Sequence, residues 1–203
     1  MIRTLPLVLS LFLVASACAQ DGEADMADHA NMAADHMEMA DIPMRANDEA
    51  RPSPNAGVMA TIGTTTVHVH YGRPSLRGRA YFADGAELAP AGQVWRTGAN
   101  EAPTITFSDN VMFGGEMVSA GTYALFTIPG DEWTVILNGT AQQWGAFRYD
   151  EGEDVVRVTA TPMTDAPQAE QFEIRFQDLS EDSATMVLHW GTVGVPVTIQ
   201  AGM

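Results

Sequence analysis

Arginine is concentrated in one stretch of an acidic chain. Four of the ten arginines lie between positions 73 and 96, a stretch with only two of the chain's 26 acidic residues. Guanidinium groups bind carboxylates and phosphates through paired hydrogen bonds, so this stretch predicts an anion-binding cluster. The alternative is that the arginines fasten loops together by pairing with acids and backbone carbonyls. The residues expected to bind a ligand are Arg73, Arg77, Arg79, Trp95, Arg96, Asn100 and Glu101.

The residues around Trp95 allow two kinds of function. An exposed indole beside a guanidinium suits the face of a sugar, although a tryptophan in an alternating segment also fits a core position. Glu101 is a candidate general acid or base, with Arg96 and Asn100 stabilising charge. Glycoside hydrolysis needs a second carboxylate at a defined separation, and the stretch offers only Asp84 and Glu87. We therefore favour a binding module for an anionic small molecule or glycan, with a hydrolase as the alternative.

Two histidines in a predicted strand form a candidate metal site. His68 and His70 are two residues apart, so they project from the same face of a strand. His189, in a later predicted strand, is a possible third ligand, and three histidines can hold zinc or copper. The alternative is a solvent-facing strand whose spacing is coincidental.

A second candidate metal site lies nearer the N-terminus. His29, Met32, His36 and Met39 are spaced by three, four and three residues, which places them on one face of any helix in this segment. Imidazole with thioether is a ligand set for Cu(I). The alternative is that these His and Met residues reflect only the biased composition of a linker and bind no metal. A copper-handling periplasmic protein is thus a third functional hypothesis, and no other cofactor is predicted.

The first 18 residues predict export. Arg3 is followed by an apolar run over residues 5–14, too short for a membrane span, and then by small residues up to Cys18. This pattern resembles the cleavage site of a bacterial lipoprotein, although Ala15 replaces the usual leucine. Cys18 is the only cysteine, so a lipid at Cys18 explains it best. Cleavage after Ala19 is the alternative, and both place the protein in the periplasm or anchored at the outer membrane.

Composition divides the remaining chain in two. Residues 19–56 are rich in Ala, Met, Asp and His and end near prolines, which predicts a disordered or partly helical tether. Residues 57–203 then form a single domain. The net charge of −16 argues against nucleic acid as a partner, and we expect membrane contact only through the lipid anchor.

The domain is predicted to be all-β. Short alternating segments are separated by Gly- and Pro-containing turns, and no segment shows a helical period. About ten short strands predict an antiparallel β-sandwich or a barrel-like sandwich. The expected strands are residues 64–71, 94–97, 104–108, 111–113, 122–128, 132–138, 154–161, 171–178, 185–190 and 195–200.

The same stretches resemble a known family. Residues 71–75 and 94–101, with further similarity at 121–130, 132–138, 144–145 and 154–158, resemble the bacterial domain of unknown function 2911 family. The resemblance implies an exported, often lipid-anchored β domain without an established activity. It singles out as motif positions Arg73, Arg77, Trp95, Arg96, Asn100 and Glu101.

Overall fold

The domain is built from antiparallel strands. The structure is a computed structural model that describes residues 51–202. The only helical element in this part of the chain is a short 3-10 helix, η1 (Glu151–Glu153). The strands are β1 (Asn55–Ile62), β2 (Thr65–Gly72), β3 (Thr104–Phe107), β4 (Val111–Phe113), β5 (Glu116–Val118), β6 (Gly121–Ile128), β7 (Trp133–Asn138), β8 (Asp154–Ala160), β9 (Ala169–Gln177), β10 (Ser183–Gly191) and β11 (Val193–Ala201).

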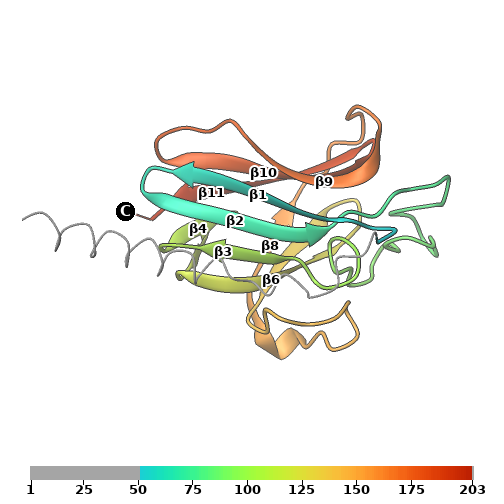
Figure 1. Cartoon of the computed structure of the whole chain (residues 1–203), viewed down its shortest axis with the longest axis horizontal. Helices are drawn as coiled ribbons and strands as arrows, with labels where there is room; N and C mark the ends of the chain where they lie inside the picture. The colour runs from blue at the N-terminus through green and yellow to red at the C-terminus, as the bar shows by residue number, and fades with distance from the viewer. Residues whose placement is uncertain (1–50, 203) are drawn as a thin grey trace, which may run out of the picture. The chain divides into compact units, whose positions relative to one another are not determined.

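The strands form two sheets that pack as a sandwich. The six-stranded sheet has the order β1-β2-β3-β6-β7-β8, and the five-stranded sheet has the order β5-β4-β11-β10-β9. Contacts join the sheets at both sides, where β1 meets β9 and β10 and β8 meets β5 and β11. Figure 1 shows β9, β10 and β11 stacked over β1 and β2. The sheets do not close into a barrel, so the predicted all-β sandwich is confirmed.

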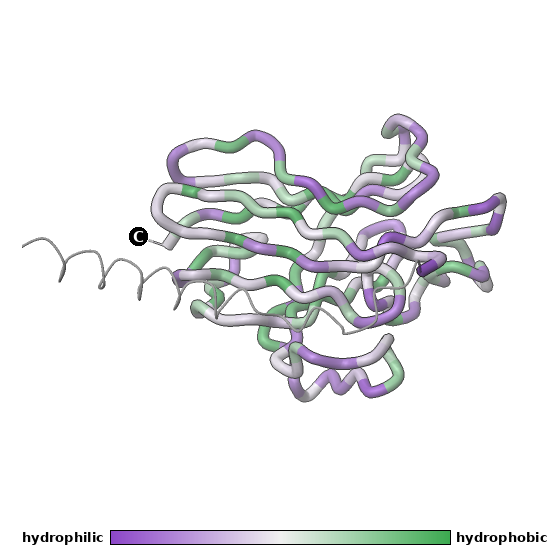
Figure 2. Tube along the Cα trace, in the orientation of Figure 1, coloured by the Kyte–Doolittle hydropathy of each residue, from purple (hydrophilic) through white to green (hydrophobic). Residues whose placement is uncertain are grey.

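Alternation along the strands separates the core from the outer faces. In β2 the side chains of Val67, Val69 and Tyr71 are buried, whereas His68 and His70 between them are half-buried. The core also takes in large apolar side chains of the other sheet, such as Trp190. Each fully buried residue of this size contributes about 1.5–3 kcal/mol to folding. Figure 2 shows hydrophilic residues collected in the connections at the strand ends.

Three details of the strand prediction were wrong. Residues 94–97 do not form a strand, because only Trp95 pairs with Thr127 before the chain turns away in the left-handed conformation at Thr97. Strand β1 was not predicted, since its Ala, Gly and Met residues have a weak β propensity. Strand β5 was missed because its Glu116 and Met117 have a weaker β propensity than Val111 and Phe113 of the equally short β4.

The folded chain also begins before the predicted boundary at residue 57. β1 starts at Asn55, and the backbone N–H of Arg73 donates to Pro54 O at 2.8 Å. Within residues 51–202, no helix is long and apolar enough to cross a membrane.

Candidate functional site

The segment that carries Arg96 lies beside the end of β6. Trp95 and Thr127 exchange two backbone hydrogen bonds of 2.7 and 2.9 Å, so residues 95–97 have strand-like alternation. The side chains of Trp95 and Thr97 are buried, and the Thr97 hydroxyl donates to the Thr127 hydroxyl at 3.1 Å. Arg96, between them, therefore points to the outer face of the six-stranded sheet.

Trp95 belongs to the core of the sandwich. Its indole stacks on Trp190 with centroids 5.7 Å apart and an interplanar angle of 10°, and Phe82 and Phe172 contact it edge-on. Only 7% of the residue is exposed. Trp95 is therefore not placed to stack on a ligand, although it was among the predicted ligand-binding residues.

Arg73 and Arg79 fasten backbone segments together. Arg73 Nε donates to Phe172 O at 3.1 Å, which joins the end of β2 to β9 of the other sheet. Arg79 donates from Nε to Leu76 O at 3.1 Å and from Nη2 to Ser75 O at 2.8 Å. Its Nη1 also pairs with Glu87 at 3.3 Å. These contacts agree with the loop-fastening alternative for these two residues.

Arg77 is exposed on the turn between Arg73 and Arg79. Its backbone is in the left-handed region with φ 49°, and its N–H donates to Glu170 Oε1 at 2.7 Å. Glu170 lies in β9, so this turn packs against the five-stranded sheet. Arg96 faces the outside of the six-stranded sheet, so the structure divides the predicted cluster between two places.

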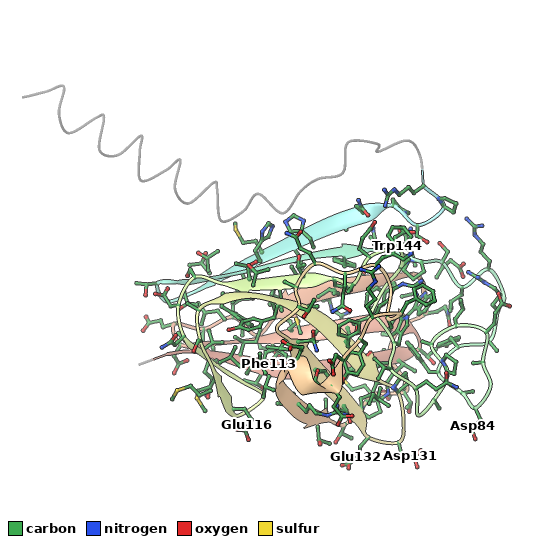
Figure 3. All side chains as sticks on the ribbon, turned by 90° about the horizontal axis from the view of Figure 1, so that it is seen from below. Asp84, Phe113, Glu116, Asp131, Glu132 and Trp144 are labelled. Atoms are coloured by element: carbon green, nitrogen blue, oxygen red, sulfur yellow. The ribbon has the colours of Figure 1, made fainter. Side chains whose placement is uncertain are left out.

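Asn100 and Glu101 tie the N-terminal end of the described chain to the loop. Asn100, with φ 65°, donates from Nδ2 to Ser53 O at 3.2 Å. Glu101 Oε2 accepts from Arg51 Nη1 at 3.3 Å, and the backbone of Glu101 forms a bridge with Trp144. In Figure 3, Trp144 lies at the upper right of the domain and Asp84 at its lower right. The hydrolase hypothesis stays a prediction.

Arg96 and one residue from each of two neighbouring segments carry buried polar atoms without hydrogen-bond partners in the described part of the chain. Arg96 Nε, Thr104 Oγ1 and Gln143 Oε1 are buried and have no partner within residues 51–202. Because Trp95 lies opposite Thr127, Arg96 lies opposite Phe126 of β6. Thr104 pairs with Ala124, so the positions of Arg96 and Thr104 are two residues, or about 7 Å, apart along β6. We call Arg96, Thr104 and Gln143 the Arg96 site.

Gln143 reaches this site from the segment after β7. Its backbone oxygen accepts from Ala102 N at 3.1 Å, which places it beside the start of β3. The side-chain amide is oriented by its nitrogen, which donates to Thr140 O at 2.8 Å and to Asn138 Oδ1 at 3.3 Å. The amide oxygen, Gln143 Oε1, is therefore an acceptor without a donor among the described residues.

The electrostatics of Arg96 distinguish it from the other arginines. Burial lowers its pKa, and no carboxylate within the described residues pairs with it. A guanidinium nonetheless keeps its proton in proteins. Arg96 is therefore a half-buried cation without a counterion, which an anionic ligand would complete.

Residues 139–153 hold this region against the sheet. Tyr149 packs edge-on against Phe126 with centroids 5.0 Å apart, on the outer faces of β6 and β7. Its hydroxyl donates to Asp154 Oδ2 at 2.5 Å, and Asn138 and Arg157 donate to the same carboxylate at 2.9 and 2.8 Å. Burial and the bond to Asp154 raise the pKa of Tyr149. The segment that positions Gln143 is thus anchored by a charged, hydrogen-bonded cluster.

Comparison with known proteins assigns the domain to a family. The model of a family described as "protein of unknown function (DUF2911)" matches residues 53–199. The chain belongs to this family. No curated protein and no solved structure matches it. The resemblance inferred from the arginine and tryptophan motifs is therefore confirmed.

The DUF2911 domain separates the three predicted metal-binding histidines. His68 and His70 lie on the outer face of β2, and His189 lies in β10 of the other sheet. His189 is buried and bonded, with Nε2 2.9 Å from Pro167 O and Nδ1 3.0 Å from Glu173 Oε1. No group of three His, Cys, Asp or Glu residues in the described part of the domain is placed to hold a metal ion. The proposed third ligand is thus wrong.

Several predictions concern residues outside the described DUF2911 domain. The leader at 1–18, lipidation at Cys18 and most of the tether at 19–56 are among them, as is the second metal site at His29, Met32, His36 and Met39. A groove of about 390 Å³ lies between β8 and β11, and none of the predicted site residues lines it.

Two residues of the Arg96 site were not predicted. Thr104 is the first residue of β3 and alternates with buried Ile105, so strand alternation could have placed it on the outer face of the domain. Gln143 precedes the Trp144-Gly145 pair of the family resemblance, but nothing in its local sequence indicates contact with β3.

Proposed function

We propose that this DUF2911 protein is an exported, lipid-anchored protein of the cell envelope that binds an anionic small molecule or glycan at the Arg96 site. The observation that carries the proposal is the half-buried guanidinium of Arg96, which has no acceptor among the described residues. Leaving a buried polar group without a partner costs about 1–3 kcal/mol, and more for a charged group. A ligand that supplies the acceptor recovers this free energy.

The neighbours of Arg96 describe the ligand further. A carboxylate or phosphate offers two acceptors in the geometry that a guanidinium fits. Thr104 Oγ1 can donate or accept and Gln143 Oε1 accepts. Both atoms are enclosed, so a ligand hydroxyl would satisfy the amide oxygen once the Gln143 side chain turns outward. The site therefore suits an anion that also carries hydroxyl groups.

Exposed aromatic residues in the segment that also carries Gln143 support the glycan form of this ligand. Trp144, whose backbone pairs with Glu101, is 57% exposed, and Phe147 is 85% exposed. Indole and phenyl faces pack against the apolar face of a sugar ring while a charged group binds the sugar's acid. In Figure 3, Trp144 lies across the view from Asp131 and Glu132, so those two carboxylates do not repel an anion there.

The test measures binding of D-glucuronate and of inorganic phosphate to the full chain by calorimetry, with D-glucose as the neutral probe. We expect glucuronate to bind and Arg96→Met to weaken it at least about tenfold, because a charge-assisted hydrogen bond contributes about 1.5–3 kcal/mol. Arg77→Met removes the same charge from an exposed turn and is the matched control. Its affinity should match that of the wild type.

Two results would contradict the proposal. One is equal affinity of the wild type and Arg96→Met for both anions. The other is a cooperative loss of stability in Arg96→Met, which would make Arg96 a structural residue. Removing a buried, unpaired charge should leave the unfolding free energy unchanged or raise it.

A further inference from the structure

The outer face of β1 and β2 carries three ligands for a soft metal ion. His68 and His70 project from this face of β2, and Met59 is the direct cross-strand partner of His68 on β1. Direct partners have Cβ atoms about 4.5–5.5 Å apart, within reach of a methionine side chain. Met59 is 63% exposed, so its thioether is free to turn toward the imidazoles.

The two imidazoles are already at the separation that a shared metal ion requires. His70 Nε2 lies 3.2 Å from His68 Nδ1, and the ring centroids are 4.0 Å apart. A tetrahedral ion with metal–nitrogen bonds of about 2.0 Å places two nitrogen ligands about 3.3 Å apart. The nitrogen pair therefore matches one edge of the tetrahedron with little movement of either ring.

The face leaves space and neutral surroundings for this ion. Gly57 is the cross-strand partner of His70, and the missing side chain lets the His70 ring lie over it, where a Cβ would be 3.4 Å from the ring. On the other side, His68 and His70 are paired with Thr106 and Thr104. None of these neighbours is charged, so the face does not provide the oxygen anions that Ca²⁺ and Mg²⁺ prefer.

We propose that Met59, His68 and His70 form a Cu(I)-binding site on the outer face of the domain. Two imidazoles and one thioether are a ligand set selective for Cu(I) among the biological metals. This site goes beyond the anion-binding function, because it uses neither Arg96 nor Gln143.

The protonation states favour metal binding near neutral pH. Burial lowers the pKa of both imidazoles, and the proximity of His68 lowers that of His70 further. Both rings are therefore neutral at pH 7. The hydrogen bond between His70 Nε2 and His68 Nδ1 places one proton between the rings, so Cu(I) binding by both nitrogens requires that proton to move to the outer nitrogen of the same ring.

The test is an anaerobic titration of the full chain with Cu(I) in competition with bathocuproine disulfonate. The His- and Met-containing segment before residue 51 can bind Cu(I) as well, so the readout is the difference between variants of the same chain. We expect the His68→Asn/His70→Asn double variant to bind one equivalent less than the wild type. Met59→Leu should weaken that equivalent at least about tenfold, since losses of this size follow even from disturbing a ligand's surroundings.

Controls separate this site from the rest of the chain. Met117→Leu removes a thioether that is at least as exposed as that of Met59, from β5 of the other sheet, and should leave Cu(I) binding unchanged. Arg96→Met should also bind Cu(I) as the wild type does, so failure of the anion proposal leaves this result intact. Because the double variant replaces half-buried rings, imidazole ¹⁵N shifts of the wild type are measured too. They should move for His68 and His70 together on Cu(I) addition.

Three outcomes would overturn the site: equal Cu(I) stoichiometry in the wild type and the double variant, unmoved ¹⁵N shifts at both rings, or unchanged affinity in Met59→Leu.

Discussion

Gly72 is the point where the loop that carries Arg96 rests on the sandwich. A Cβ at Gly72 would lie 2.3 Å from Ala99 O and 3.0 Å from Ala99 C, both backbone atoms. Ala99 N also donates to Gly72 O at 3.2 Å, which closes residues 96–101 onto the end of β2. Gly72→Ala therefore forces a whole loop to move, because no side chain is available to rotate away.

The size of the effect follows from these contacts. Carbon and oxygen approach to about 3.3 Å at closest, so the loop must shift by about 1 Å. Overpacking of this kind costs about 1–3 kcal/mol, and the weakened hydrogen bond adds about 1 kcal/mol. Reduced freedom of the unfolded chain returns about 0.4–1 kcal/mol. We expect Gly72→Ala to lower the unfolding free energy by about 1–3.6 kcal/mol.

Urea denaturation followed by tryptophan fluorescence measures this loss, since Trp95, Trp133 and Trp190 are buried. Gly139→Ala is the control, because its added Cβ meets nothing closer than 3.4 Å. It should remain within about 0.5 kcal/mol of the wild type. Gly72→Ala should also weaken glucuronate binding, as Arg96 moves with its loop. Wild-type stability in Gly72→Ala would refute the argument that this glycine is required by the contact with Ala99.

Two further predictions concern the histidine pair and the N-terminus. The pKa values of His68 and His70 are lowered in the folded state, so the unfolded chain binds more protons below pH 6.5. The contribution of these histidines to the unfolding free energy is therefore fully present above pH 6.5 and is lost as the pH falls. The rise in unfolding free energy between pH 5 and 7 should be smaller in His68→Gln/His70→Gln than in the wild type; identical slopes would exclude this linkage. Metabolic labelling with palmitate should mark the wild type and not Cys18→Ser. Mass spectrometry of the mature N-terminus should show a lipidated Cys18. An unmodified N-terminus after Ala19 would instead indicate a soluble periplasmic protein.

The arginine cluster illustrates what local sequence can and cannot predict. Its residue types indicate side chains that form paired hydrogen bonds. Arg73 and Arg79 donate to backbone carbonyls, whereas Arg96 Nε has no acceptor among the described residues. Which arginine donates to a carbonyl and which is left over depends on strands far away in sequence, such as β9. The alternation of residues 95–97 separates Trp95 from Arg96, but only the bridge to Thr127 decides which of them faces the core.

The strands were predictable where β-branched and aromatic residues alternate, as in β2 and β6, because that pattern suits a pleated surface with one buried face. β1 was not predicted because Gly57 and Met59 have a weak β propensity, and only the pairing of β1 with β2 places them opposite the imidazoles. Hence the His68–His70 spacing was visible in the sequence, whereas the register that pairs Met59 with His68 was not.

By itself, the sequence determined the all-β class, the family and the residues with chemical potential, since these follow from periodicity, turn residues and local motifs. Only the tertiary structure decided that His189 lies on the other sheet, that Trp95 is core, and that Arg96, Thr104 and Gln143 each keep a buried polar atom without a partner among the described residues. The physical reason is that strand order and register bring together residues up to about a hundred positions apart, and no local pattern records which edges pair.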